Sequence, residues 1–161
     1  MREPGGRKLA KKSAGLLIYR FTDRGIEVFL VHPGGPFWEK KDEGAWSIPK
    51  GEYEADEDPF QAARREFKEE TGFDAPSGTV YRLEPVRQPS GKLISAWAVK
   101  GDFDALAVVS NSFTMEWPPK SGKVHEFPEV DRARWFDLET AKTKIIRGQL
   151  GFVIELENTL S

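Results

Sequence analysis

The chain contains no cysteine and only two histidines, His32 and His125, among its 161 residues. Without cysteine it has no disulfide framework, no thiolate nucleophile and no cysteine-ligated zinc site. The two histidines do not have metal-ligand spacing to each other, so we interpret both as structural or incidental.

Long hydrophobic runs are also absent. No apolar run approaches the roughly 18 residues that a membrane-spanning helix needs. Basic residues near the N-terminus precede a short apolar run, but this run is too short for a signal peptide, lacks a small-residue cleavage site and continues as a plausible strand. We therefore expect residues 1–12 to form a flexible basic tail, and the protein to be cytoplasmic.

The chain has no large excess of charge of either sign. Its 24 basic and 26 acidic side chains leave a formal net charge of −2. This balance argues against a broad nucleic-acid surface, whose signature is a basic patch. The length fits one domain, residues 13–161, with five Trp and eleven Phe available for its core. We expect a monomer or homodimer that binds a small molecule, with no long nucleic acid and no membrane as a partner.

Acidic residues are concentrated in one segment, residues 51–73, which reads GEYEADEDPFQAARREFKEETGF. If this segment is helical, Glu66, Glu69 and Glu70 lie on one face, because residues three and four apart are neighbours on a helix. Such crowded charges repel one another unless a cation lies between them, and Mg²⁺ prefers carboxylate oxygens. The pattern favours a metal site for phosphate chemistry, and the alternative is a solvated acidic face.

The same segment has the local signals of a helix. Pro59 suits a first turn, and Gly72 stands where a left-handed C-terminal stop is expected. Phe60, Ala63 and Phe67 lie on a second face that can pack on a sheet. The pattern predicts a helix with one apolar face and one acidic face.

The wider spacing is far more specific than the acidic cluster alone. The segment matches G-x5-E-x7-R-E-U-x-E-E-x-G-U, with U apolar, at every fixed position. Average residue usage makes a chance match on the order of one in 10⁹ per start position. The preceding residues 46–51, WSIPKG, are similar to the W-x-x-P-K-G lead-in of several branches of one family. The chain therefore resembles the Nudix hydrolase family.

The resemblance implies an α/β/α sandwich with a mixed sheet. It also implies hydrolysis of a phosphoanhydride in a nucleoside diphosphate derivative, with Mg²⁺ as the cofactor and Mn²⁺ as the alternative. The predicted ligand set is Glu66, Glu69 and Glu70, with Glu66 and Glu70 as the direct carboxylate ligands, and Gly51 is added to this set.

The general base is less well specified, because the family draws it from different places. Glu69 is one candidate and Glu129, in a late acidic segment, is another; Glu126 lies close enough to compete. Arg65 is included among the catalytic candidates with a structural role, holding Glu57 or a metal-binding carboxylate in place.

The rest of the chain predicts a mixed α/β domain. Strands are expected at residues 14–20, 27–32, 79–86, 93–100 and around 134–136, and helices at about 137–147 and 148–158. Residues 115–130 are rich in proline and are predicted to be a substrate-side loop that is not regular throughout.

In the family that the chain resembles, substrate specificity lies outside the motif at residues 51–73, so substrate-binding residues are sought in other segments. The segment 34–46 carries rings that could stack on a base, although Phe37 or Trp38 could equally be tucked into the core. The predicted contacts are Trp38, Trp46, Lys50, Arg87 and Lys120.

The lead-in at residues 46–51 resembles that of branches that act on diadenosine polyphosphates or related nucleoside polyphosphates. Nucleoside triphosphates are the second substrate class that the resemblance implies, and ADP-ribose and nucleotide sugars are the third. A Nudix module that senses a nucleotide without cleaving it, and an unrelated Ca²⁺-binding acidic helix, are the alternatives.

Overall fold

The computed structural model describes residues 12–161, so residues 1–11 of the predicted tail lie outside it. Lys12, assigned to that tail, is instead the first residue of a strand and pairs with Leu93. The strands and helices in chain order are β1 (Lys12–Thr22), β2 (Gly25–Pro33), β3 (Lys50–Glu52), α1 (Pro59–Thr71), β4 (Val80–Arg82), β5 (Val86–Arg87), β6 (Leu93–Lys100), η2 (Ala105–Ala107), β7 (Ser112–Glu116), β8 (Val124–Pro128), β9 (Val130–Asp137), α2 (Leu138–Lys144), η3 (Arg147–Gln149) and α3 (Leu150–Leu160).

The main sheet is mixed and has β1 at its centre. Its strand order is β4-β6-β1-β2-β9, with β3 also paired to β1 and β5 to β6. The β1–β6 pair is parallel and the other pairs are antiparallel. Strand β1 is buried along most of its length, as expected for a strand covered on both faces.

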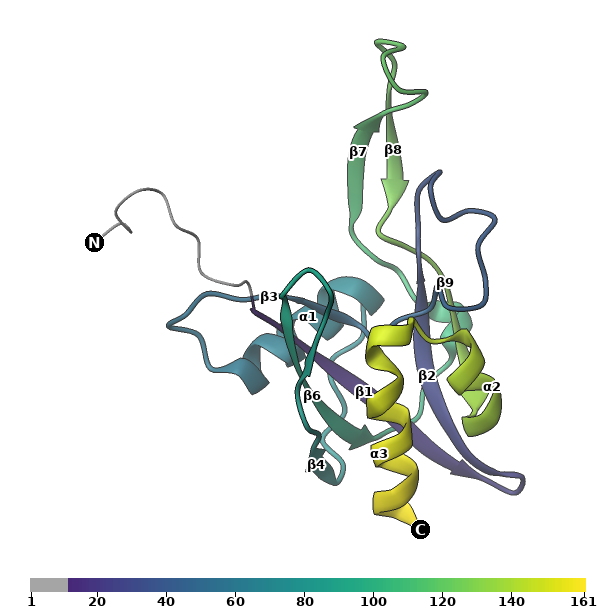
Figure 1. Ribbon diagram of the computed structural model, residues 1–161. Coiled ribbons are helices and arrows are strands. Elements are labelled where there is room, and N and C mark those ends of the chain that lie inside the picture. Colours follow the sequence, from purple (N-terminus) through teal and green to yellow (C-terminus); the bar gives the residue numbers. More distant parts are fainter. Residues whose placement is uncertain (1–11) are drawn as a thin grey trace.

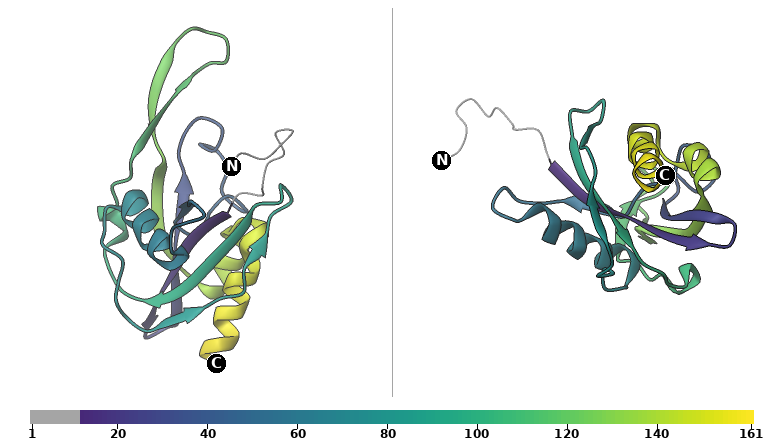
Figure 2. Two further views of the ribbon diagram at one scale, coloured as in Figure 1. Left: turned by 90° about the vertical axis from the view of Figure 1, so that its left-hand side faces the viewer. Right: turned by 90° about the horizontal axis from the view of Figure 1, so that it is seen from below.

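Helices cover both faces of this sheet (Figures 1 and 2). On one face, Ala62, Ala63 and Phe67 of α1 pack in a buried cluster with side chains of β1, β2 and β6. On the other face, a second buried cluster includes Phe152 and Leu156 of α3. The predicted α/β/α sandwich is confirmed.

Helix α1 begins and ends where its sequence predicts. Asp58 accepts a hydrogen bond from the Gln61 N–H at 3.0 Å, which caps the N-terminus ahead of Pro59. Gly72 has a φ of +82° and its N–H donates to the Lys68 carbonyl at 2.8 Å. This left-handed stop is a conformation that glycine adopts without steric cost.

The largest departure from prediction lies between residues 112 and 128, where β7 and β8 form an antiparallel hairpin that projects beyond the main sheet (Figure 1). The prediction of a loop was wrong for these strands. Pro118 and Pro119 lie in the turn and Pro128 at the last strand position, so none interrupts the ladder. Strand β3 was not predicted, and the predicted strand 79–86 is divided into β4 and β5.

No helix within residues 12–161 is both long and apolar enough to cross a membrane.

Candidate active site

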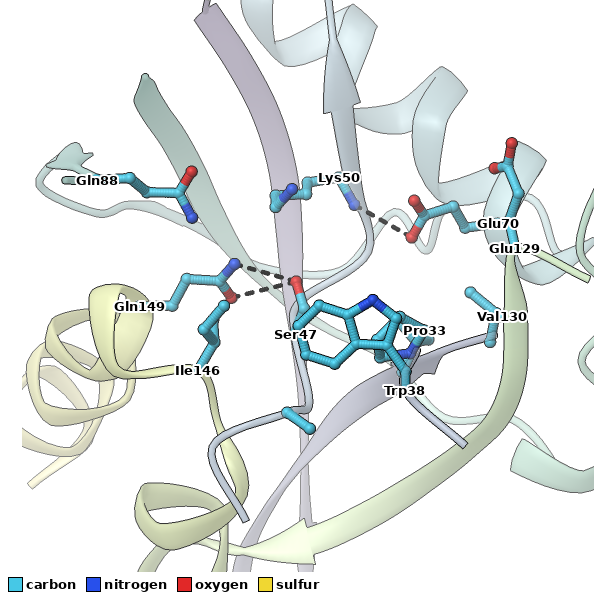
Figure 3. Close-up of a pocket in the computed structure, with 12 residues that line it drawn as sticks. Pro33, Trp38, Ser47, Lys50, Glu70, Gln88, Glu129, Val130, Ile146 and Gln149 are labelled. Atoms are coloured by element: carbon cyan, nitrogen blue, oxygen red, sulfur yellow. Dashed lines mark hydrogen bonds between the residues drawn. The ribbon is translucent and has the colours of Figure 1, made fainter. Parts of the chain in front are cut away.

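A cavity of about 200 Å³ opens between the C-terminal end of α1, the start of β9 and the segments that precede β3 and α3. Figure 3 shows Glu70 and Glu129 on one side, Gln88, Ile146 and Gln149 on the other, and Trp38 and Lys50 between them. We call these two sides the acidic end and the amide end. The lining residues are Val31, Pro33, Trp38, Ala45, Ser47, Lys50, Glu70, Gln88, Glu129, Val130, Ile146 and Gln149.

Glu70 is the least solvated carboxylate at the acidic end. Burial raises its pKa to about 8, opposed by the charge of Lys50 and increased by the charges of Glu66 and Glu129. Its Oε1 accepts a long hydrogen bond, 3.4 Å, from the Lys50 backbone N–H. Burial lowers the pKa of the Lys50 amine in the same environment. Acid and amine therefore share a poorly hydrated region in which charge interactions are strong.

Glu66 depends on the absence of a side chain at Gly51. A methyl group built at Gly51 would overlap the Glu66 carboxylate. The Glu66 side chain is only 13% exposed, and its pKa is raised, first by burial and then by the neighbouring Glu69. Gly51 therefore lets this carboxylate lie against β3.

Arg65 connects the charged groups around this helix face. Its guanidinium donates to both Glu57 oxygens, at 3.1 and 3.0 Å, and to Glu66 Oε2 at 2.7 Å. Glu69 Oε1 is farther away, at 3.7 Å, and its side chain is 42% exposed. Arg65 therefore contacts both Glu57 and Glu66, the kind of carboxylates that it is predicted to hold, and Glu69 is more exposed than Glu66.

The donor set fits a hard divalent cation by its chemistry. Glu66 and Glu70 supply anionic oxygens with poor hydration, which a cation would relieve. Within residues 12–161, no three acidic or histidine side chains are already arranged as a metal-binding group. Two carboxylates with space for water and phosphate oxygens are the usual environment of Mg²⁺, which keeps part of its hydration shell.

The two late glutamates differ in position. Glu129 lines the cavity, and its charge raises the pKa of Glu70, so it lies close to the acidic end. Glu126 is exposed on β8 opposite Thr114 and does not line the cavity. The geometry favours Glu129 over Glu126 as a group that acts in the site.

Trp38 is half-buried in the cavity wall, with the Lys41 ammonium 5.0 Å from its ring centroid. Its ring is thus available to a ligand, and the alternative of a core position does not apply. Phe37 is 57% exposed and lies edge-to-face on Trp117 of the hairpin, with ring centroids 5.2 Å apart.

Trp46 lies in the core, contrary to its predicted role in substrate binding. It is 1% exposed, packs edge-to-face on His32 and Phe136, and donates its indole N–H to Asp42 at 2.8 Å. Trp46 and Ile48 are core residues, whereas Ser47 between them lines the cavity.

Two predicted cations are not among the residues that line the cavity. Lys120 lies in the exposed tip of the β7–β8 hairpin, with a φ of +61°. Arg87 is exposed, and its guanidinium donates to the Gly91 carbonyl at 2.8 Å. Lys50 alone among the three predicted substrate-binding cations lines the cavity.

The histidines have no place in the cavity lining. His32 is fully buried, with Nδ1 2.8 Å from Asp131 Oδ1 and Nε2 2.6 Å from the Lys41 carbonyl. His125 is exposed on β8. Both positions agree with the structural or incidental interpretation.

The amide end was missed by the sequence interpretation. Gln149 is fully buried; its Oε1 accepts from the Ile48 N–H at 3.0 Å, and its Nε2 donates to Ser47 Oγ at 3.0 Å. Gln88, the residue directly after β5, lines the same wall. Gln149 is 101 positions from Ile48 and 102 from Ser47, so no local sequence pattern indicates these contacts.

Comparison with known proteins gives a consistent family. The model of the NUDIX domain matches residues 10–154. The RNA pyrophosphohydrolase of Gluconacetobacter diazotrophicus is 39% identical over 69 residues, which is 43% of this chain and only 35% of that protein. The chain thus matches about a third of that curated relative.

Solved structures extend the likeness to nearly the whole chain. The Ap4A hydrolase of C. elegans in a binary complex is 25% identical, covers 94% of this chain and 100% of its own, and has a TM-score of 0.60. The NUDIX domain of Shewanella oneidensis NrtR, complexed with ADP ribose, is 17% identical, covers 99% and 94%, and has a TM-score of 0.67. With the complete motif at residues 51–73, whose Glu70 lines the cavity, and the NUDIX match over most of its length, the chain belongs to the Nudix hydrolase family.

Proposed function

We propose that the protein hydrolyses a phosphoanhydride bond of a nucleoside polyphosphate, with Mg²⁺ as the cofactor and Mn²⁺ as a substitute. The observation that carries this proposal is the acidic end. Glu70, Glu129 and Lys50 converge on one part of a cavity whose wall also holds Trp38. Charge chemistry and an aromatic surface are therefore available to one bound molecule.

Glu66 and Glu70 would hold the divalent cation, which screens the phosphate charge and makes water more acidic. Water attacks phosphorus, the bridging P–O bond breaks, and the leaving phosphate takes the bonding electron pair. Glu129 accepts the proton of the attacking water as general base. The Lys50 ammonium offers a charged donor to a phosphate oxygen in the same poorly hydrated region.

The cavity wall supports nucleotide recognition. The Trp38 ring can stack on a base, and such stacking is worth about 1–3 kcal/mol. At the amide end, the Gln88 side chain has no hydrogen-bond partner within residues 12–161 and can bind the edge of that base.

The named relatives rank the substrates. One neighbour is named as an Ap4A hydrolase, so diadenosine polyphosphates come first and nucleoside triphosphates second. ADP-ribose and nucleotide sugars come third, because the ADP-ribose-bound neighbour shows the fold alone. A cytoplasmic location and a monomeric or homodimeric state remain predictions.

The test is a panel of diadenosine tetraphosphate, ATP, ADP-ribose and a nucleotide sugar, each incubated with protein and Mg²⁺. Product formation is followed by anion-exchange chromatography, and binding by calorimetry. Hydrolysis of a polyphosphate with the highest kcat/KM is the expected result. Binding without product across the panel would identify a nucleotide sensor instead, and faster cleavage of ADP-ribose would reverse the ranking.

A further inference from the structure

The backbone around Glu129 is held from both sides, although its side chain is exposed. Residues 128–130 join β8 to β9. The Glu129 N–H donates to the Asn111 carbonyl at 2.8 Å, and the Glu129 carbonyl accepts from the Gly34 N–H at 2.9 Å. One residue of a connecting segment thus has both backbone groups paired to distant parts of the chain.

Asn111 is in turn connected to the helix that carries Glu70. Its N–H donates to the Glu69 carbonyl at 3.2 Å, and the Val109 N–H donates to the Thr71 carbonyl at 2.9 Å. These bonds satisfy carbonyls that the last turn of α1 leaves without a helical partner. A continuous set of backbone hydrogen bonds therefore runs from the end of α1 through Asn111 to Glu129 and Gly34.

Gly34 closes this set by a tight contact. A methyl group at Gly34 would overlap the carbonyl oxygen of Pro128, the residue before Glu129. The obstacle is backbone rather than a flexible side chain, so the methyl group can be accommodated only if the Pro128–Glu129 segment moves.

A neighbouring side chain makes the same segment more rigid. Ser110 Oγ accepts from the Val130 N–H at 3.0 Å. Together these contacts define the backbone on both sides of Glu129. Glu126, in contrast, lies within the projecting β8 strand, where no such contact directs it to the cavity.

We propose that Gly34, Asn111 and Ser110 are positioning residues that set the distance between the Glu129 carboxylate and the Glu70 carboxylate. This inference rests on the proposed function, in which Glu129 is the general base. It explains why an exposed glutamate in a connecting segment can act in the site. A general base must lie within hydrogen-bond reach of the proton it removes, and a misplacement of about 1 Å can cost about 10²-fold in rate.

The test is a double-mutant cycle between Gly34→Ala and Glu129→Gln on the best substrate of the panel. Gly34→Ala is expected to lower kcat about 10²-fold and to change KM less than about threefold. In the Glu129→Gln background it should have no further effect on kcat, because the displaced group is already absent. Additive losses, a change in KM alone, or an unchanged kcat would overturn the positioning role.

Gly151→Ala is the matched control, because a methyl group there meets only Val86 at 3.8 Å. It should leave kcat unchanged. If Gly34→Ala does not fold, Ser110→Ala replaces it in the same cycle, with a smaller loss of kcat that must likewise disappear in Glu129→Gln.

Two further outcomes separate this inference from the proposed function. Wild-type kcat in Glu129→Gln would show that Glu129 is not the general base, and would overturn the positioning proposal as well. If the wild type cleaves no nucleotide, crystal structures of wild type and Gly34→Ala decide: Glu129 should move away from Glu70 by about 1 Å or more, and an unchanged position would overturn the inference.

Discussion

The acidic end and the amide end of the cavity are held by different means. At the acidic end, Glu70 lies on α1 one turn after Glu66, and this helix has a side-chain cap at one end and a glycine stop at the other. The amide end is assembled from β5's continuation, the segment before β3 and the residue before α3. The groups proposed to act in the reaction lie at the acidic end, so changes there should mainly lower kcat. The groups proposed to bind the base are Trp38 and the amide end, so changes there should mainly raise KM.

The largest effect is expected at Glu70. Glu70→Gln removes a buried anionic oxygen, so we predict a loss of about 10³-fold or more in kcat with the fold intact, as expected when several kcal/mol of charge stabilisation are removed. Steady-state kinetics and circular dichroism check this. Glu139→Gln, at an 82% exposed side chain on α2, is the control and should be neutral. Near-normal kcat in Glu70→Gln would remove this residue from the metal site.

Gly51 tests whether Glu66 needs its close position. Gly51→Ala places a methyl group against the Glu66 carboxylate, so we predict a loss of about 10²-fold in kcat together with weaker Mg²⁺ binding in calorimetry. Gly151→Ala again serves as the neutral control. Unchanged Mg²⁺ affinity in Gly51→Ala would show that Glu66 is not a ligand.

Trp38 tests whether the base-binding part of the cavity acts mainly on KM. Trp38→Ala should raise KM about tenfold, since base stacking is worth roughly 1–3 kcal/mol, and should leave kcat nearly unchanged. Lys120→Ala, at the hairpin tip, should change neither value. A loss confined to kcat in Trp38→Ala would break the division between the two ends.

The smallest effect concerns pH. A carboxyl whose pKa is raised on folding adds stability that is fully present below about pH 4.5 and is lost as the pH rises through about 8. Without divalent cations, the wild-type Tm should therefore fall between about pH 6 and pH 9 more than the Tm of Glu70→Gln. Mg²⁺ binds the ionised form, so it should raise the wild-type Tm more at the higher pH. Differential scanning fluorimetry measures both effects, and equal slopes for the two proteins would contradict them.

The sequence predicted the parts of this molecule that local patterns determine. Helix α1, its two faces and its Gly72 stop follow from spacing within 23 residues, and the sandwich follows from the family resemblance and the alternation of strands and helices. The burial of Trp46 was not predicted, because an aromatic residue near a motif can face the core or the cavity, and only tertiary packing decides between them.

The hairpin and the amide end were not predicted from the sequence for a second reason. Prolines in residues 115–130 suggested a loop, but their positions at the turn and at a strand end leave the β7–β8 ladder intact. Gln149 meets Ile48 across 101 positions. Such contacts depend on how the chain returns to the same place, which periodicity does not encode.

The most direct test of the account is ³¹P NMR of a mixture of diadenosine tetraphosphate, ATP and ADP-ribose incubated with the protein, first with Mg²⁺ and then with excess chelator. With Mg²⁺, a polyphosphate resonance should be consumed, and its loss should stop when the cation is removed. Consumption that continues in chelator, or no consumption of any component with Mg²⁺, would contradict metal-dependent hydrolysis at the Glu66 and Glu70 face.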